Sequence, residues 1–454
     1  MQKFIVNLSG KRYDRLSHAI LGAVCVLLIT RLFVLINNHA VNVLYWDQWE
    51  FYTPLFEQRS LWEHFAYQYG PHCLGIGGVL IKIVAELSGW NARVEAFVVG
   101  ALACLSCVAA LGLKRRLLGP LTALDAAIPM ITLTLCQYQT FLGATNPDYG
   151  SLPALIFCYS IALTFRNCPA KYAAIVILNF LILFTGYGVF IGPVTIGLLA
   201  VDCWHNRKSE RSLFLPLSAL IASVAALIVF FARYDFNAPT GNVAGAGAKW
   251  WQYPVFMALM FARFVRPEVG PPGWLSYIAA VLGLLIFLLS VALFCRHGWL
   301  VIRDGLDRKW SVVISVLTGY CLLFSLNAAI GRAPMGLNGS QSSRYMSLMV
   351  VGFLSLYFHL TALESSRAKR AMLAVFFVLL IPGHLPLGLG ADHPASYYSV
   401  NKRNWKECYL KYEDVEKCDA LPDLITDFDI GVAGAKWKLD YLKRKKLNLY
   451  LDSR

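Results

Sequence analysis

The sequence predicts an all-α polytopic membrane protein, and three observations support this class. The chain of 454 residues is 57% hydrophobic and only 15% charged, whereas a soluble domain carries about 25% charged residues. Its mean hydropathy is +0.54, and apolar runs long enough to cross a bilayer recur along the chain. Aromatic residues make up 13% of the sequence, which is typical of membrane proteins with interfacial aromatic belts.

The basic residues indicate how the chain is threaded, not a nucleic-acid partner. The net charge is +14, but most Lys and Arg residues lie in short loops between apolar runs, as the positive-inside rule requires. The sequence contains no DNA- or RNA-binding motif. Lys11, Arg12 and Arg15 precede the first run, 16–36, which is too long for the core of a cleavable signal. We therefore expect a first span whose N-terminal side is cytoplasmic.

Run length and loop charge together predict about eleven spans. With this threading the basic clusters, such as Lys-Arg-Arg at 114–116, fall on one side of the membrane. A break at Thr185-Gly186-Tyr187-Gly188 divides one apolar run into two spans joined by an outer turn. The expected spans cover residues 16–36, 94–113, 121–138, 151–165, two segments of 172–201, 213–231, 274–294, 310–330, 345–363 and 372–389.

Two outer segments complete the expected organisation. Residues 74–87 are apolar but short of the roughly twenty residues needed to span, so we expect an interfacial helix within a first outer loop at 37–93. The transmembrane module covers residues 1–389, and a small C-terminal segment at 390–454 lies outside. Cys408 and Cys418 fall in this segment, where an oxidising compartment would allow a disulfide.

The first outer loop holds the leading catalytic candidates, in the stretch Tyr45-Trp46-Asp47-Gln48-Trp49-Glu50. Asp47 and Glu50 share a face if this stretch is helical. Trp46 and Trp49 would then form an aromatic pair at the headgroup level. A carboxylate beside the membrane is costly to desolvate, and a desolvated carboxylate is a better general base. The alternative is that these acids only solvate a loop.

Two further candidates lie in the outer loops. His72 could be a ligand or a proton relay, although a lone histidine is more often structural. Asp148, in the second outer loop, could face Asp47, or it could cap the next span. The sequence leaves both alternatives open.

Outer-face arginines suggest an anion site. Arg332 and the pair Arg344-Tyr345 stand at the outer ends of spans, against the charge rule. Two guanidiniums there could clamp a lipid phosphate, or they could reach toward headgroups. Arg31, near the outer end of the first span, could snorkel or join the same basic site.

On these features the chain resembles the GT-C superfamily of polytopic glycosyltransferases, which use polyprenyl-phosphate sugars. The matching elements are Asp47 after the first span, the helix introduced by Pro71-His72, the stretch Ser-Gly-Trp-Asn-Ala-Arg at 88–93, and Lys-Arg-Arg-Leu-Leu-Gly at 114–119. Mannosyl- and aminoarabinose-transferase relatives share this order, which covers roughly residues 1–120; the rest matches only in topology. The Trp-Asp-Gln-Trp stretch, the Ser-Ser-Arg-Tyr stretch and the Cys-bearing tail are similar to bacterial or phage glucosyltransferases that modify O-antigen.

The resemblance implies an inverting hexosyltransferase of a bacterial inner membrane, with its C-terminus in the periplasm. The donor would be an undecaprenyl-phosphate-linked hexose, and the acceptor a glycan such as the O-antigen of lipopolysaccharide. Asp47 would activate the acceptor hydroxyl, and Arg332 and Arg344 would hold the leaving phosphate. The family's His-Pro-Pro stands here as Gly-Pro-His at 70–72, which leaves the function of His72 open. Some relatives carry a metal, but no convincing ligand cluster is present, so we expect no cofactor and keep a divalent metal as an alternative.

Two other functions fit the same topology. An O-antigen polymerase would share the lipid carrier but use an oligosaccharide donor. A flippase for lipid-linked sugars would show internal repeats or ionisable midplane residues, and the sequence has no repeat and spans nearly free of charge at their centres. The break at 185–188 is the one feature that favours transport, and an outer turn explains it equally well.

Overall fold

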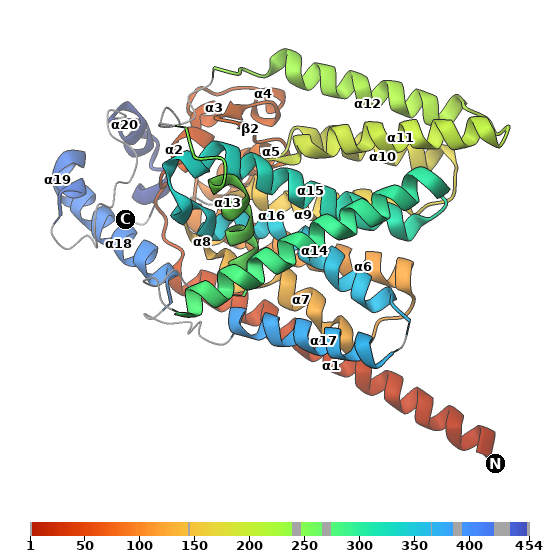
Figure 1. The fold of residues 1–454 in the computed structure, drawn as a ribbon. Helices are drawn as coiled ribbons and strands as arrows, with labels where there is room; N and C mark the ends of the chain where they lie inside the picture. The colour runs from red at the N-terminus through yellow and green to blue at the C-terminus, as the bar shows by residue number, and fades with distance from the viewer. Residues whose placement is uncertain are drawn as a thin grey trace.

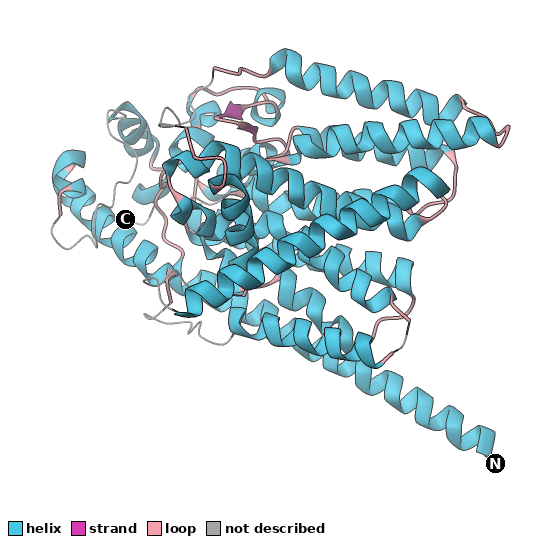
Figure 2. Ribbon diagram, viewed as in Figure 1, coloured by secondary structure: helices cyan, strands magenta, loops and turns pink. Residues whose placement is uncertain are grey.

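The protein is all-α, as a computed structural model of residues 2–143, 146–237, 247–265, 274–364, 366–384, 393–421 and 436–451 shows (Figures 1 and 2). Within these described residues, seven helices are long and apolar enough to cross a membrane. The chain is therefore a multi-pass helical membrane protein. These long helices are α1 (Gln2–His39), α6 (Ala92–Leu118), α11 (Ile191–Lys208), α12 (Phe214–Arg233), α14 (Trp274–Asp304), α15 (Lys309–Arg332) and α16 (Met346–Ala362). The 3-10 turns that precede α11 and α16 extend these two to Gly188–Lys208 and Ser343–Ala362, of 21 and 20 residues.

Of the eleven expected spans, seven coincide with these long helices and four with shorter segments in the described residues. Helices α9 (Pro147–Leu163), α10 (Pro169–Leu183) and α17 (Arg367–Leu380) occupy three of the expected positions but have only 17, 15 and 14 residues. A helix rises about 1.5 Å per residue, so none of the three reaches across a hydrocarbon core of about 30 Å unless it is tilted or extended. Part of the last expected span, 385–389, lies outside the described residues.

The expected span at 121–138 is not one helix. It consists of a 3-10 turn at Ala123–Ala126, α7 (Ala127–Thr132), a turn at Leu135–Gln137 and α8 (Tyr138–Leu142). Side chains satisfy backbone groups at the interruption: Thr134 Oγ1 accepts from the Cys136 N–H, and the Gln137 amide donates to the Thr132 carbonyl at 2.7 Å. A break buried inside a bundle is tolerated only with such partners, and hydropathy alone does not reveal it.

The break at 185–188 is confirmed. Helices α10 and α11 are separated by Thr185–Gly188 and a 3-10 turn at Gly188–Phe190. Gly186 has φ +55°, and the Gly186 N–H donates to the Cys73 carbonyl at 2.8 Å. A Cβ on Gly188 would lie 1.9 Å from the Ile182 carbonyl oxygen. The turn therefore requires glycine at both positions. Its bond to Cys73 places it against the loop that precedes α5 (Ile76–Ser88).

The first outer loop folds into short elements on the end of the bundle. They are α2 (Gln48–Phe51), α3 (Thr53–Phe56), α4 (Leu61–Phe65), the hairpin strands β1 (Gln68–Tyr69) and β2 (His72–Cys73), and α5 (Ile76–Ser88). Helix α5 occupies the position of the expected interfacial helix, with Leu87 84% exposed. Its Gly77 lies so close to Asp148 of α9 that an added Cβ would be 2.4 Å from the Asp148 nitrogen.

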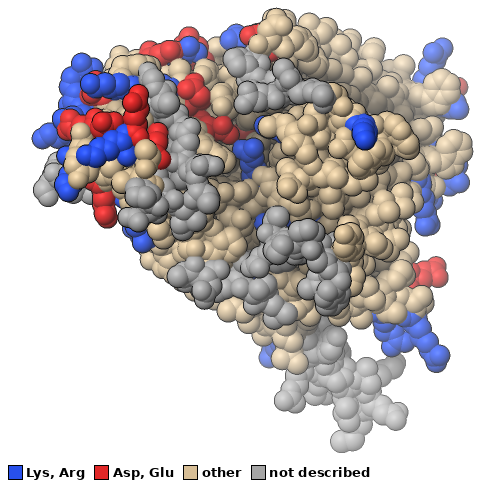
Figure 3. Space-filling view, turned by 60° about the vertical axis from the view of Figure 1, so that its left-hand side comes forward, with Lys and Arg blue, Asp and Glu red and all other residues tan. Residues whose placement is uncertain are grey.

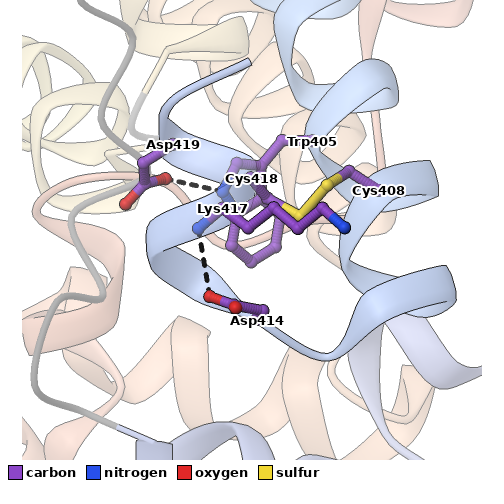
Figure 4. Close-up of a disulfide and its surroundings, with 6 residues drawn as sticks. All are labelled: Trp405, Cys408, Asp414, Lys417, Cys418 and Asp419. Atoms are coloured by element: carbon purple, nitrogen blue, oxygen red, sulfur yellow. Dashed lines mark hydrogen bonds between the residues drawn. A yellow bond between two sulfur atoms is a disulfide. The ribbon is translucent and has the colours of Figure 1, made fainter.

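The C-terminal segment packs on this same end of the molecule. It contains α18 (Ala395–Tyr412), α19 (Val415–Asp419) and α20 (Lys436–Lys445). The expected disulfide is confirmed: Cys408 and Cys418 are bonded, with their Cα atoms 5.7 Å apart. The Trp405 indole donates to Asp419 beside it at 2.7 Å (Figure 4). The bridge and this bond hold α19 against α18.

One hydrophobic core joins the first outer loop to the C-terminal segment. Trp49 and Tyr52 of the loop share it with Trp405 of α18 and Leu439 of α20. The described parts of the segment at 390–454 therefore pack on the loop at 37–93. Acidic and basic side chains gather over this end in Figure 3, and an area with few charged side chains lies between them and the charged, mostly basic residues at the opposite edge of the view.

Candidate functional site

Loops that are far apart in the sequence meet at one end of the bundle and enclose two adjoining cavities. Helices α2, α8 and α18 gather there, opposite the N-terminus (Figure 1). We call the smaller cavity, of about 210 Å³, the carboxylate cavity, because Asp47 and His72 line it. The larger one, of about 420 Å³, is the amide cavity, since Gln139 and Asn338 line it. The walls they share are Trp46, Arg332, Arg344 and Tyr345.

Asp47 follows a sharp turn and is the residue directly before α2. The preceding Trp46 has φ +48°, a left-handed conformation that is rare for a bulky residue. Strained backbone of this kind persists where surrounding contacts determine it, and it concentrates at functional sites. The Tyr69 hydroxyl donates to Asp47 Oδ1 at 3.0 Å, and Arg344 Nη1 lies 3.3 Å from Asp47 Oδ2. The carboxylate is thus held on both oxygens and faces the cavity.

The two arginines come from the ends of neighbouring helices. Arg332 ends α15 and is half-buried, while Arg344 lies in the 3-10 turn Ser343–Tyr345 that opens α16. Gln139 of α8 fixes this turn, because its Oε1 accepts from the Arg344 backbone N–H at 3.2 Å and from the Ser342 hydroxyl at 3.1 Å. Two guanidiniums on the wall of one cavity favour an anionic ligand.

His72 closes the inner end of the carboxylate cavity. It is 6% exposed and stacks on Tyr187, with ring centroids 5.2 Å apart. Burial lowers the pKa of His72 to about 4, so the imidazole is neutral at neutral pH. Neither ring nitrogen has a hydrogen-bond partner among the described residues. A neutral imidazole has one N–H donor and one acceptor to offer a ligand.

Asp148 lies directly behind His72. Its Oδ2 is 3.5 Å from His72 Nε2, and its side chain is 1% exposed. Asp148 does not line either cavity. Asp148 can therefore act on a ligand only through His72, and we interpret it as a residue that positions His72.

Besides Asp148, three expected site residues lie outside the cavities. Glu50 turns away from Asp47 and pairs with Lys438 of α20 at 3.0 Å. Trp49 is 1% exposed in the core beneath the loop, whereas Trp46 is 46% exposed, so the two rings do not form the expected pair. Arg31 lies 3.4 Å from His384 and away from both cavity walls. The turn at Trp46 explains why the two Trp rings separate, because it lies before the helical register of α2. Asp47 continues that register, so the partner of Glu50 is set by its contact with Lys438 of α20.

Some cavity residues were missed from the sequence. Tyr69, Gln139 and Tyr398 are neutral residues whose positions depend on tertiary contacts between distant loops. Tyr69 had a usable signal, since it precedes the singled-out Gly-Pro-His at 70–72. Gln139 and Tyr398 had none, because no motif surrounds them.

The described residues contain no group of three His, Cys, Asp or Glu side chains placed to hold a metal ion. Comparison with family models, curated proteins and solved structures finds no match to this chain. The arguments for a function therefore rest on the geometry of the two cavities.

Proposed function

We propose that this protein is a membrane glycosyltransferase that moves a hexose from an undecaprenyl-phosphate-linked donor to a periplasmic glycan such as O-antigen. One observation carries the proposal. A carboxylate, Asp47, faces an arginine, Arg344, in a cavity that Arg332 also lines, at the end of a membrane bundle. Transfer from a phosphate-linked sugar needs a base for the acceptor and cations for the leaving phosphate.

Each charged residue has a defined task in this reaction. Asp47 accepts the proton of the acceptor hydroxyl as its oxygen attacks the anomeric carbon. The bond between that carbon and the phosphate oxygen breaks, and the configuration at the carbon is inverted. Negative charge then collects on undecaprenyl phosphate, which Arg344 and Arg332 stabilise. Tyr69 keeps the Asp47 carboxylate oriented through its 3.0 Å hydrogen bond.

The Asp47–Arg344 contact is one that a substrate can replace. At 3.3 Å, with both side chains about one-quarter exposed, it is a modest ion pair. A donor phosphate competes for the guanidinium and releases one carboxylate oxygen for the acceptor. Neutral His72 donates or accepts a hydrogen bond at the inner wall without adding charge.

This function also requires one orientation of the protein in the membrane. The cavities face the periplasm of a bacterial inner membrane, where lipid-linked sugars and O-antigen meet, and the N-terminus is cytoplasmic. The donor, the glycan acceptor and membrane lipids are its partners. Nothing in the charge distribution calls for nucleic acid.

Transfer of radiolabelled hexose from a synthetic polyprenyl-phosphate donor to lipopolysaccharide in proteoliposomes tests the proposal. We expect Asp47→Asn to lower kcat by about 10²–10⁴-fold, the contribution of a general base, and Arg344→Ala by about 10²–10³-fold. Glu57→Gln is the matched control, since this exposed carboxylate pairs with Arg59 in the same loop. It should retain wild-type rates.

Three results would contradict the proposal. Wild-type transfer unaffected by Asp47→Asn would remove the base from the site. No transfer by the wild type, together with movement of labelled donor across the bilayer, would identify a flippase. A product that gains a whole oligosaccharide repeat would identify a polymerase.

A further inference from the structure

The amide cavity differs chemically from the carboxylate cavity beside it. Apart from the four shared walls, its described lining residues include no charged side chain. Amides, a hydroxyl and an aromatic ring line it instead: Gln139, Asn146, Asn338, Gln341, Ser342 and Tyr398. Its volume of about 420 Å³ falls within the range of about 300–1,000 Å³ for small-molecule sites. It is built for a neutral ligand rich in hydrogen-bonding groups.

Tyr398 is the contribution of the C-terminal segment to this wall. It lies in the first turn of α18, and its hydroxyl accepts from the Gln139 amide at 2.8 Å, so its own O–H remains a donor. Lys402, one turn later, anchors α18 by donating to the Leu142 and Gly143 carbonyls at 3.1 and 2.8 Å. These contacts with α8 therefore fix the position of Tyr398.

Gln139 connects this wall to the anion site. The same side chain that binds Tyr398 also accepts from the Arg344 N–H. A ligand in the amide cavity is thereby positioned against the shared wall of Trp46, Arg332 and Arg344, next to Asp47. The exposed Trp46 ring, stacked on Tyr45 at 4.8 Å, is rigid enough to present an aromatic face.

We propose that the amide cavity is the acceptor subsite and binds an uncharged sugar unit of the acceptor glycan, with Tyr398 as a specificity-determining residue. Sugar hydroxyls match amide and phenol groups, and sugar C–H faces match an indole. A phosphate or an acidic sugar would instead need cations beyond the shared wall. This inference rests on the proposed function, and it assigns the two substrates to separate cavities.

The test separates the KM for acceptor from the KM for donor. Tyr398→Ala should raise the KM for neutral O-antigen polysaccharide about tenfold, as expected for a loss of one hydrogen bond and one ring contact, and raise the KM for polyprenyl-phosphate hexose much less. Asn338→Trp, at an exposed position of the same wall, should have the same effect by filling the cavity. Tyr412→Ala, an exposed tyrosine on the same helix, should change neither constant.

A direct binding measurement keeps this inference distinct from the reaction. Saturation-transfer NMR of methyl α-glucoside with the full-length protein in detergent should give a signal that Asn338→Trp reduces at least threefold. If the wild type turns over no donor but this signal and its loss are observed, the proposed function fails and the neutral-sugar subsite stands. An equal rise in both KM values, or a glucoside signal unchanged by Asn338→Trp, would overturn the acceptor subsite.

Discussion

Gln48 holds the turn that presents Asp47, although it touches neither cavity. It is fully buried, its Oε1 accepts from the Tyr45 N–H at 3.2 Å, and its Nε2 donates to the buried carboxyl of Glu95 at 3.4 Å. The Tyr52 hydroxyl donates to the other oxygen of Glu95. These bonds bracket Trp46, whose left-handed conformation aims Asp47 at Arg344. We therefore predict that Gln48→Ala lowers activity from outside the site.

The expected size of the effect follows from those two bonds. Each neutral hydrogen bond contributes about 0.5–1.5 kcal/mol net, and a buried group left without its partner costs about 1–3 kcal/mol. Gln48→Ala should thus destabilise the turn by roughly 2–4 kcal/mol. A displacement of Asp47 by about 1 Å is enough to lower kcat by about 10²-fold. The KM for the donor should change little, because Gln139 holds the turn that carries Arg344 and α15 carries Arg332, both outside the Gln48 network.

The assay is the kcat of hexose transfer in proteoliposomes, with the melting temperature in detergent as a check on folding. Glu57→Ala serves as the control, since this exposed side chain lies in the same loop outside the Gln48 network. A folded Gln48→Ala protein with kcat within twofold of wild type would refute the reasoning. It would mean that Asp47 is positioned by Tyr69 and Arg344 alone.

Three further predictions concern folding at this end of the molecule. Gly77→Ala places a Cβ 2.4 Å from the Asp148 nitrogen and should lower the melting temperature, at a cost of about 1–3 kcal/mol, whereas Gly197→Ala in open space should not. Cys408→Ser removes the disulfide and should destabilise the α18–α19 pair by about 2 kcal/mol, which limited proteolysis of the C-terminal segment measures. Burial lowers the pKa of His393 from 6.5 to about 4 while its Nδ1 accepts from Ala395. As the pH drops, the unfolded chain binds a proton on this histidine before the folded protein does. The free energy of unfolding should therefore stay level above about pH 6.5, fall between about pH 6.5 and 4, and be about 2 kcal/mol lower at pH 5. Melting curves of His393→Gln should show a weaker fall.

The sequence predicts the membrane bundle well because bilayer thickness dictates run length. The long helices α1, α6, α12 and α15 fall where apolar runs of about twenty residues predict them. The broken segment at 121–142 was missed for a physical reason. Its polar groups, such as Thr134 and Gln137, satisfy their own backbone at the break, and hydropathy averages over such residues.

The candidate site was accessible from the sequence only in its charged residues. Asp47, Arg332 and Arg344 are conspicuous because charge is rare in this chain and each stands at the end of an apolar run. Glu50 looked equivalent to Asp47, and only their tertiary partners separate them: Arg344 contacts Asp47, whereas Lys438 contacts Glu50. The left-handed conformation of Trp46 was equally hidden. No residue type signals that conformation, because Trp disfavours it and tertiary contacts impose it.

Two lysines of the C-terminal segment help to hold the candidate site together. The sequence predicts no role for them, yet Lys402 and Lys438 are buried and donate to carbonyls at the end of α8 and within α2, respectively. A buried ammonium is retained only where carbonyls or carboxylates satisfy it, so each of the two lysines fixes a wall of the site in place. The bundle anchors the arginines, the first outer loop carries the carboxylate, and α18 brings Tyr398 to them. A site assembled from three separate stretches of chain cannot be read from one motif, and it should be lost cooperatively when α18 is released.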